Sequence, residues 1–97
     1  MAANIEDISI EYLEGDDVIV KELDKEVLSK GAWTTIVFKY QDWDRKKKIY
    51  GPERFTIRRY RKMGGEYRQQ SKFNISSKDQ AEKIINTLQK WIDDSKD

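Results

Sequence analysis

The stretch WTTIVFKYQDW, residues 33–43, decides the fold, because its side chains alternate with a period of two, as in a β-strand. Thr34, Ile36, Phe38 and Tyr40 fall on one side of an extended chain, and both tryptophans fall on the other. A strand whose second side met only water would seldom carry two tryptophans. We therefore expect both sides of this strand to contact other groups.

Three further stretches predict strands of the same sheet. Residues 18–28 are rich in β-branched and apolar side chains and form one long strand, with a bulge expected near Asp24. Residues 54–62 and 67–75 alternate in the same way as residues 33–43. Gly64–Gly65 joins them as a hairpin turn, because glycine reaches positive φ without steric cost. The order predicts a four-stranded antiparallel meander.

The chain ends in a predicted amphipathic helix. Ser76 and Ser77 are candidate N-caps, with Asp79 and Gln80 three residues further on in the positions of a capping box. Apolar residues then recur at helical spacing, at Ala81, Ile84, Ile85, Leu88, Trp91 and Ile92. We expect this stripe to cover the sheet face formed by Ile36, Phe38, Phe55, Ile57 and Phe73. The predicted fold class is α+β, a curved four-stranded sheet with a C-terminal helix packed on one face.

A chain of 97 residues builds one hydrophobic core, so a single domain is expected. We place this domain at residues 17–93, between an acidic N-terminal tail at residues 1–16 and a frayed end at residues 94–97. The tail is predicted to be mobile or loosely docked. The alternative is that it lies over a basic face and competes weakly for a ligand.

The chain contains neither cysteine nor histidine, which argues against an enzyme. The usual pairs of nucleophile and base need these residues, and so do the commonest zinc and copper sites. We predict no catalytic residues, no cofactor and no metal. The alternative is that Asp42, Asp44 and Glu53 hold Mg²⁺ for phosphodiester cleavage. These acids lie in or beside a lysine-rich loop, where carboxylates more often balance local charge.

Residues 1–20 lack the basic start and apolar run of a signal peptide, and no stretch has the roughly 20 apolar residues of a membrane span. We expect an intracellular protein without membrane contact, cytoplasmic or, in a eukaryote, nuclear.

The formal net charge of +1 conceals an uneven distribution. Residues 1–20 carry six acids and no base, residues 21–72 carry fifteen bases and seven acids, and residues 73–97 carry four bases and five acids. The middle segment is therefore where a polyanion would bind.

Basic and aromatic residues are expected on the sheet face that the helix leaves open. Lysine and arginine neutralise phosphates, and exposed rings stack on unpaired bases, which favours single strands over a duplex. The predicted nucleic-acid-binding residues are Trp33, Lys39, Trp43, Arg58, Tyr60, Lys62, Arg68 and Lys72 on the sheet, and Arg45, Lys46, Lys47 and Lys48 in the loop that follows residue 44. The alternative is a protein-interaction module in which the same exposed aromatic rings form the interface.

Three local motifs carry a resemblance to a known family: TIRRY at 56–60, GGE at 64–66 and KFNISSKDQAEKIINTL at 72–88. With them, the region from Leu23 to Trp91 resembles the positive-cofactor-four family of transcriptional coactivators, whose fold is related to that of the Whirly proteins. The resemblance implies homodimers that bind single-stranded DNA on curved sheets, with a coactivator-like role in transcription. It places Arg58 and Tyr60 at nucleic-acid-facing positions, and Trp33 and Lys39 on the neighbouring strand.

The chain departs from the pattern of this family at two places. Lys72 stands where the family commonly has glycine, and the loop at residues 43–53 is longer and more basic. A repeat of the purine-rich-element-binding type has the same order of four strands and one helix. Because that repeat also binds single strands, the expected ligand is the same for both families.

Overall fold

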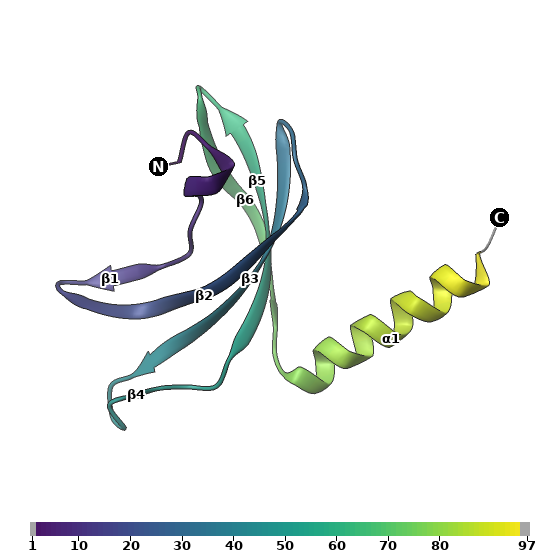
Figure 1. The fold of residues 1–97 in the computed structure, drawn as a ribbon. Coiled ribbons are helices and arrows are strands. Elements are labelled where there is room, and N and C mark those ends of the chain that lie inside the picture. Colours follow the sequence, from purple (N-terminus) through teal and green to yellow (C-terminus); the bar gives the residue numbers. More distant parts are fainter. Residues whose placement is uncertain (1, 96–97) are drawn as a thin grey trace.

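A computed structural model describes residues 2–95 of the chain, which form an α+β fold with a curled antiparallel sheet and one C-terminal helix (Figure 1). The sheet has the shape of a half-barrel. Its elements are the 3₁₀ helix η1 (Ile5–Asp7), β1 (Tyr12–Glu14), β2 (Asp17–Ser29), β3 (Trp33–Asp44), β4 (Ile49–Tyr50), β5 (Arg54–Met63), β6 (Glu66–Ile75) and α1 (Lys78–Asp94).

The four long strands β2, β3, β5 and β6 are neighbours in that order and antiparallel, so the predicted meander is confirmed. The predicted bulge is also present, as a shift of register between Glu22 and Asp24. Gly64 and Gly65 have φ of 60° and 82°, the left-handed values that a two-residue hairpin turn requires.

The prediction of four strands is wrong, because two short strands join the sheet and make six. β1 folds back on the start of β2, and β4 folds back on the end of β3. The second turn is stabilised by the Asp44 carboxylate, whose Oδ1 accepts from the backbone N–H groups of Lys46 at 2.9 Å and Lys47 at 3.0 Å. Such a carboxylate-to-backbone contact is local, and it extends the hairpin beyond the stretch that alternates.

The register of the sheet differs from the expected arrangement of its faces. Ile36 stands opposite Arg58, and Phe38 stands opposite Thr56. Residues paired directly across antiparallel strands point to the same side. Ile36 and Phe38 therefore share the concave side with Thr56 and Arg58, and the expectation that they share a face with Phe55 and Ile57 is wrong. We call the opposite side, which carries Val37, Ile57 and Phe73, the convex side.

The concave side is filled by residues 2–10, which we call the N-terminal segment. Ile8 and Ile10 are buried and pack with Ile36, Phe38, Tyr40 and Tyr60 to form the hydrophobic core. Figure 1 shows η1 lying inside the curl of the sheet. The prediction of a loosely attached acidic tail is therefore wrong for these residues, because their three isoleucines supply the apolar layer that the sheet needs.

Helix α1 begins as predicted. The Ser77 Oγ accepts from the Gln80 N–H at 3.1 Å, and the Gln80 Oε1 accepts from the Ser76 N–H at 2.7 Å. The expectation that α1 packs on a sheet face is wrong, because the helix projects away from the sheet and none of its residues is buried (Figure 1). Of the predicted frayed end, Asp94 is still helical and Ser95 caps the helix, whereas residues 96 and 97 lie outside the described residues.

Candidate nucleic-acid interface

The predicted binding residues do not share one side of the sheet. Trp33, Lys39 and Trp43 alternate along the convex side of β3, and Arg68 stands opposite Arg61 on the same side. The concave side carries Arg58, Tyr60, Lys62 and Lys72, and the turn between β3 and β4 carries Arg45, Lys46, Lys47 and Lys48. The expected single face of charge and rings is therefore divided in two.

Tyr60 is not available for stacking. Its side chain is only 6% exposed and belongs to the core beneath Ile8. Burial raises the pKa of its phenol, and the charge and hydrogen bond of the neighbouring Arg58 act in the opposite direction. A base could reach this ring only if the N-terminal segment left the concave side.

Arg58 is also directed into the fold. It is half-buried, and its Nη1 donates to the Gln69 Oε1 at 3.0 Å. Its Nε is buried and has no hydrogen-bond partner among residues 2–95. The Nη1 bond and the buried Nε direct this part of the guanidinium into the fold, away from a phosphate in solvent. Lys72, opposite Arg58 on β6, is the exposed cation of this pair.

On the convex side, Trp33 forms a compact cluster with two arginines that the sequence analysis did not select. The indole is 41% exposed. The Cζ atoms of Arg59 and Arg61 lie 4.5 Å and 5.3 Å from the centroid of the Trp33 ring, which is cation–π geometry. Within residues 2–95 neither arginine forms a salt bridge. We call Trp33, Arg59 and Arg61 the tryptophan–arginine cluster.

The backbone around the cluster is tied down by hydrogen bonds from three elements. Gly31 turns the chain from β2 into β3 with a φ of 140°, and its carbonyl accepts from the Thr34 Oγ1 at 3.1 Å and from the Tyr67 hydroxyl at 3.2 Å. The Lys62 N–H donates to the Ala32 carbonyl at 2.8 Å. These bonds link the turn before Trp33 to the β5–β6 hairpin, so the ring and both guanidiniums are carried on a common support.

Sequence reasoning missed Arg59 and Arg61 because it placed the wrong side of β5 beside the tryptophan. The alternation along the strand already groups these arginines with Ile57, since residues 57, 59 and 61 are two apart and point to the same side of β5. The missing information was the register, which sets Trp33 opposite Arg61 and Val37 opposite Ile57. A register shift of one residue moves every side chain of a strand to the opposite face. The sequence of a strand does not reveal such a shift when both of its faces carry polar and apolar residues.

The other predicted aromatic residue, Trp43, stabilises the end of the sheet. Its ring meets Tyr50 of β4 edge-to-face, with centroids 5.0 Å apart. The Tyr50 hydroxyl donates to the Val18 carbonyl at 2.8 Å, and Lys21 lies over its ring. Half-buried Trp43 is thus a cross-strand contact that holds the β3–β4 hairpin against β2.

The loop cations differ in their availability. Arg45 pairs with Glu14 across the β1 and β4 hairpins. Lys46, Lys47 and Lys48 are exposed on the turn and make no salt bridge within the part of the chain described. The loop therefore retains a local positive charge at the Asp44 end of β3, and Trp33 lies at the other end of the same strand.

Among residues 2–95, no group of three or more histidine, cysteine, aspartate or glutamate side chains is placed to hold a metal ion. No helix in this range is long and apolar enough to cross a membrane.

Comparison with protein-family models, with curated proteins and with solved structures gave no match. The resemblance to the positive-cofactor-four family therefore stays a prediction, and the site is interpreted from its own geometry.

Proposed function

We propose that this protein binds single-stranded nucleic acid, DNA in preference to RNA, through the tryptophan–arginine cluster on the convex side. The observation that supports the proposal is an exposed indole with two guanidiniums over its ring, neither of which has a carboxylate partner within residues 2–95. An unpaired base stacks on such a ring, and each guanidinium neutralises a neighbouring phosphate.

The positive charge around the cluster extends the proposed surface. Lys30 lies in the adjoining turn, and Arg68 stands opposite Arg61 on β6. Acids also lie at this end: the Glu66 carboxylate is 3.9 Å from Arg68, and Asp7 lines a pocket together with Arg68. Trp33 lies about 36 Å along β3 from Asp44, which precedes the lysines, so Lys46–Lys48 form a second, purely electrostatic contact.

A coactivator-like role in transcription inside the cell, cytoplasmic or nuclear, is part of the same proposal and rests on the resemblance described above. The protein acts in this proposal as a binding module without a catalytic step. Its preference for single strands follows from the stacking contact, because the bases of a duplex already stack on one another.

Fluorescence anisotropy with labelled oligo-dT, an RNA of the same length and a DNA duplex, at two salt concentrations, tests this function. We expect Trp33→Ala to weaken oligo-dT binding roughly 10- to 100-fold, the loss of one base–aromatic stack. Arg59→Gln and Arg61→Gln should each weaken binding and reduce the salt slope by about 0.7.

Two variants away from the cluster are the controls: Tyr12→Ala, an exposed ring on β1, and Lys83→Gln, an exposed cation on α1. Both should bind as the parent does. If all three cluster variants also bind as the parent does, the proposed surface is wrong.

The second candidate function is a protein-interaction module on the same side. It is favoured by the apolar row of Val37, Ile57 and Phe73 across three neighbouring strands, with Phe73 50% exposed. Affinity for a protein partner held by this row would change little with salt, whereas oligonucleotide affinity falls steeply. The same titration therefore separates the two functions.

A further inference from the structure

A groove of about 510 Å³ lies between the N-terminal segment and the β5–β6 hairpin. Asp7 and Ser9 line it from the N-terminal segment, and Tyr67, Arg68 and Gln69 line it from β6. Figure 1 shows η1 facing these strands from inside the curl of the sheet. The volume is within the range of sites that hold small organic groups.

The groove has an apolar floor and a polar rim. Ile8 and Tyr60, which are 4% and 6% exposed, form the floor, and the half-buried ring of Tyr67 adds a wall. The other side chains named above are polar and exposed. An apolar floor covers the flat side of a ring, and a few polar groups at the rim fix its orientation. This arrangement fits a nucleobase, which is flat and carries its polar atoms on its edges.

Hydrogen bonds hold the two walls of the groove together without a ligand. The Tyr67 N–H donates to the Ala2 carbonyl at 2.8 Å, and the Tyr67 hydroxyl donates to the Gly31 carbonyl at 3.2 Å. On the other wall, the Ser9 hydroxyl donates to Glu22 Oε1 at 2.8 Å. The groove is therefore preformed, and the Gly31 bond connects it to the turn that supports the tryptophan–arginine cluster.

The rim still has hydrogen-bonding capacity for a ligand. The Gln69 Oε1 already accepts from Arg58 at 3.0 Å, which leaves the amide N–H groups of Gln69 as donors. The Asp7 carboxylate receives only a long contact of 3.4 Å from Asn4, and it makes no salt bridge among residues 2–95. An ionised carboxylate can only accept. The groove thus offers acceptor oxygens on one wall and donors from Gln69 and Arg68 on the other.

This pattern distinguishes between the bases. Adenine, cytosine and guanine each carry an exocyclic amino group, which can donate to a carboxylate, and a nearby ring nitrogen or carbonyl, which can accept from an amide or a guanidinium. Thymine and uracil carry no amino group. Their one free N–H lies between two carbonyl oxygens, which a carboxylate repels. Asp7 therefore favours a base with an amino group.

The groove lies within reach of a strand that is bound at the tryptophan–arginine cluster. Trp33, Arg61 and Arg68 stand in one row across β3, β5 and β6, and Arg68 also borders the groove. With neighbouring strands about 4.8 Å apart, this row is about 10 Å long, a distance that about three stacked nucleotides span. Because β6 is the edge of the sheet, a bound strand can pass around it into the groove.

We propose that this groove binds one base of the strand held at the cluster and selects a base that carries an exocyclic amino group. Asp7 accepts from the amino group, and Gln69 donates to the acceptor atom beside it. The inference rests on the proposed function and adds a base preference to it. Stacking alone supplies no such preference, because every base has a flat side.

Fluorescence anisotropy with oligo-dT and with the same oligonucleotide carrying one central cytosine tests the preference. The cytosine should raise the affinity roughly 5- to 20-fold, in the range of one specific base contact. A third oligonucleotide carries 2-pyrimidinone at that position, a base that lacks only the amino group of cytosine, and it should bind as oligo-dT does. Equal affinity for cytosine and 2-pyrimidinone overturns the proposal.

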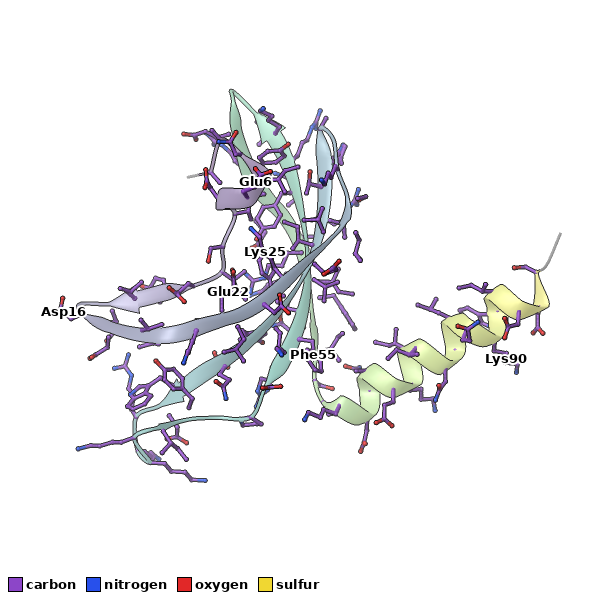
Figure 2. All side chains as sticks on the ribbon, viewed as in Figure 1. Glu6, Asp16, Glu22, Lys25, Phe55 and Lys90 are labelled. Carbon is purple, nitrogen blue, oxygen red and sulfur yellow. The ribbon has the colours of Figure 1, made fainter. Side chains whose placement is uncertain are left out.

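Two variants locate the preference on the protein. Asp7→Asn keeps the size of the side chain but replaces one acceptor oxygen with a donor, so it should abolish the preference for cytosine and still bind oligo-dT. Glu6→Gln is the matched control, because Glu6 is the exposed neighbouring acid on η1 and does not line the groove (Figure 2). It should keep the preference. An Asp7→Asn variant that keeps it, or a Glu6→Gln variant that loses it, contradicts the assignment to the groove.

The same titrations separate this inference from the function on which it rests. A parent chain that binds oligo-dT with no gain from cytosine overturns the groove and leaves the proposed function standing. A parent chain that binds neither oligonucleotide overturns both.

Discussion

At the scale of single residues, the structure separates residues that look alike in the sequence. Arg58 and Arg59 are adjacent, yet Arg58 lies half-buried on the concave side and Arg59 lies exposed over Trp33. Likewise Tyr60 is a core residue, whereas Trp33 keeps an accessible ring. Composition predicts the kinds of residue that a polyanion surface would need, but exposure decides which of them could contact a ligand.

Tyr60 also predicts how stability depends on pH. Burial raises the pKa of its phenol above the ordinary value of 10.0, so the folded state favours the protonated form. This contribution is complete below about pH 10, where the unfolded chain is protonated too, and it is lost as the pH rises through the folded pKa. Urea unfolding between pH 8 and pH 11 should show this loss in the parent and a shallower one in Tyr60→Phe. Tyr12→Phe, at an exposed site, should behave as the parent, and an unchanged profile in Tyr60→Phe would contradict the assignment.

At the scale of elements, alternation and capping predicted what is local. The four long strands, the bulge near Asp24, the glycine turn and the start of α1 all depend on residues close in the chain, and all are confirmed. The N-terminal segment was missed because Ile5, Ile8 and Ile10 are spaced among acids and lack the period of a long strand. Their burial depends on contacts with strands far along the sequence, which no local pattern contains.

The attachment of the N-terminal segment gives a prediction at this scale. The Lys25 Nζ donates to the carbonyls of Ile5, Glu6 and Ile8 at 3.1, 2.9 and 2.7 Å, and Glu22 Oε1 accepts from Ser9 and from the Ile10 N–H. Figure 2 shows Lys25 and Glu22 of β2 beside this segment. Lys25→Met removes the ammonium but keeps much of the apolar stem, and it should cost about 1 to 3 kcal/mol of unfolding free energy.

Hydrogen exchange locates that effect. In Lys25→Met the amides of residues 5–10 should exchange faster than in the parent, while those of the β5–β6 hairpin change little. Lys21→Met is the control for loss of a β2 lysine. Lys21 lies four residues before Lys25 on the same strand, and its ammonium lies over the Tyr50 ring. Uniform acceleration across the sheet would mean that the segment is not attached as an independent unit.

At the scale of the whole molecule, the chain is a packed half-barrel with its core on the concave side, and the apolar stripe of α1 and the Phe73 ring are exposed outside it. This division follows from the register, which sets Phe38 inside at 0% exposure and Phe73 outside at 50%. In the sequence both are phenylalanines at alternating strand positions, so their energetic roles cannot be distinguished before the strands are paired.

Urea denaturation distinguishes them. Phe38→Ala should lower the unfolding free energy by about 3 to 5 kcal/mol, since it leaves a cavity in a closed core. Phe73→Ala should cost less than half as much, because half of its side chain already meets water. Equal costs for the two phenylalanines would contradict the assignment of the core to the concave side of the sheet.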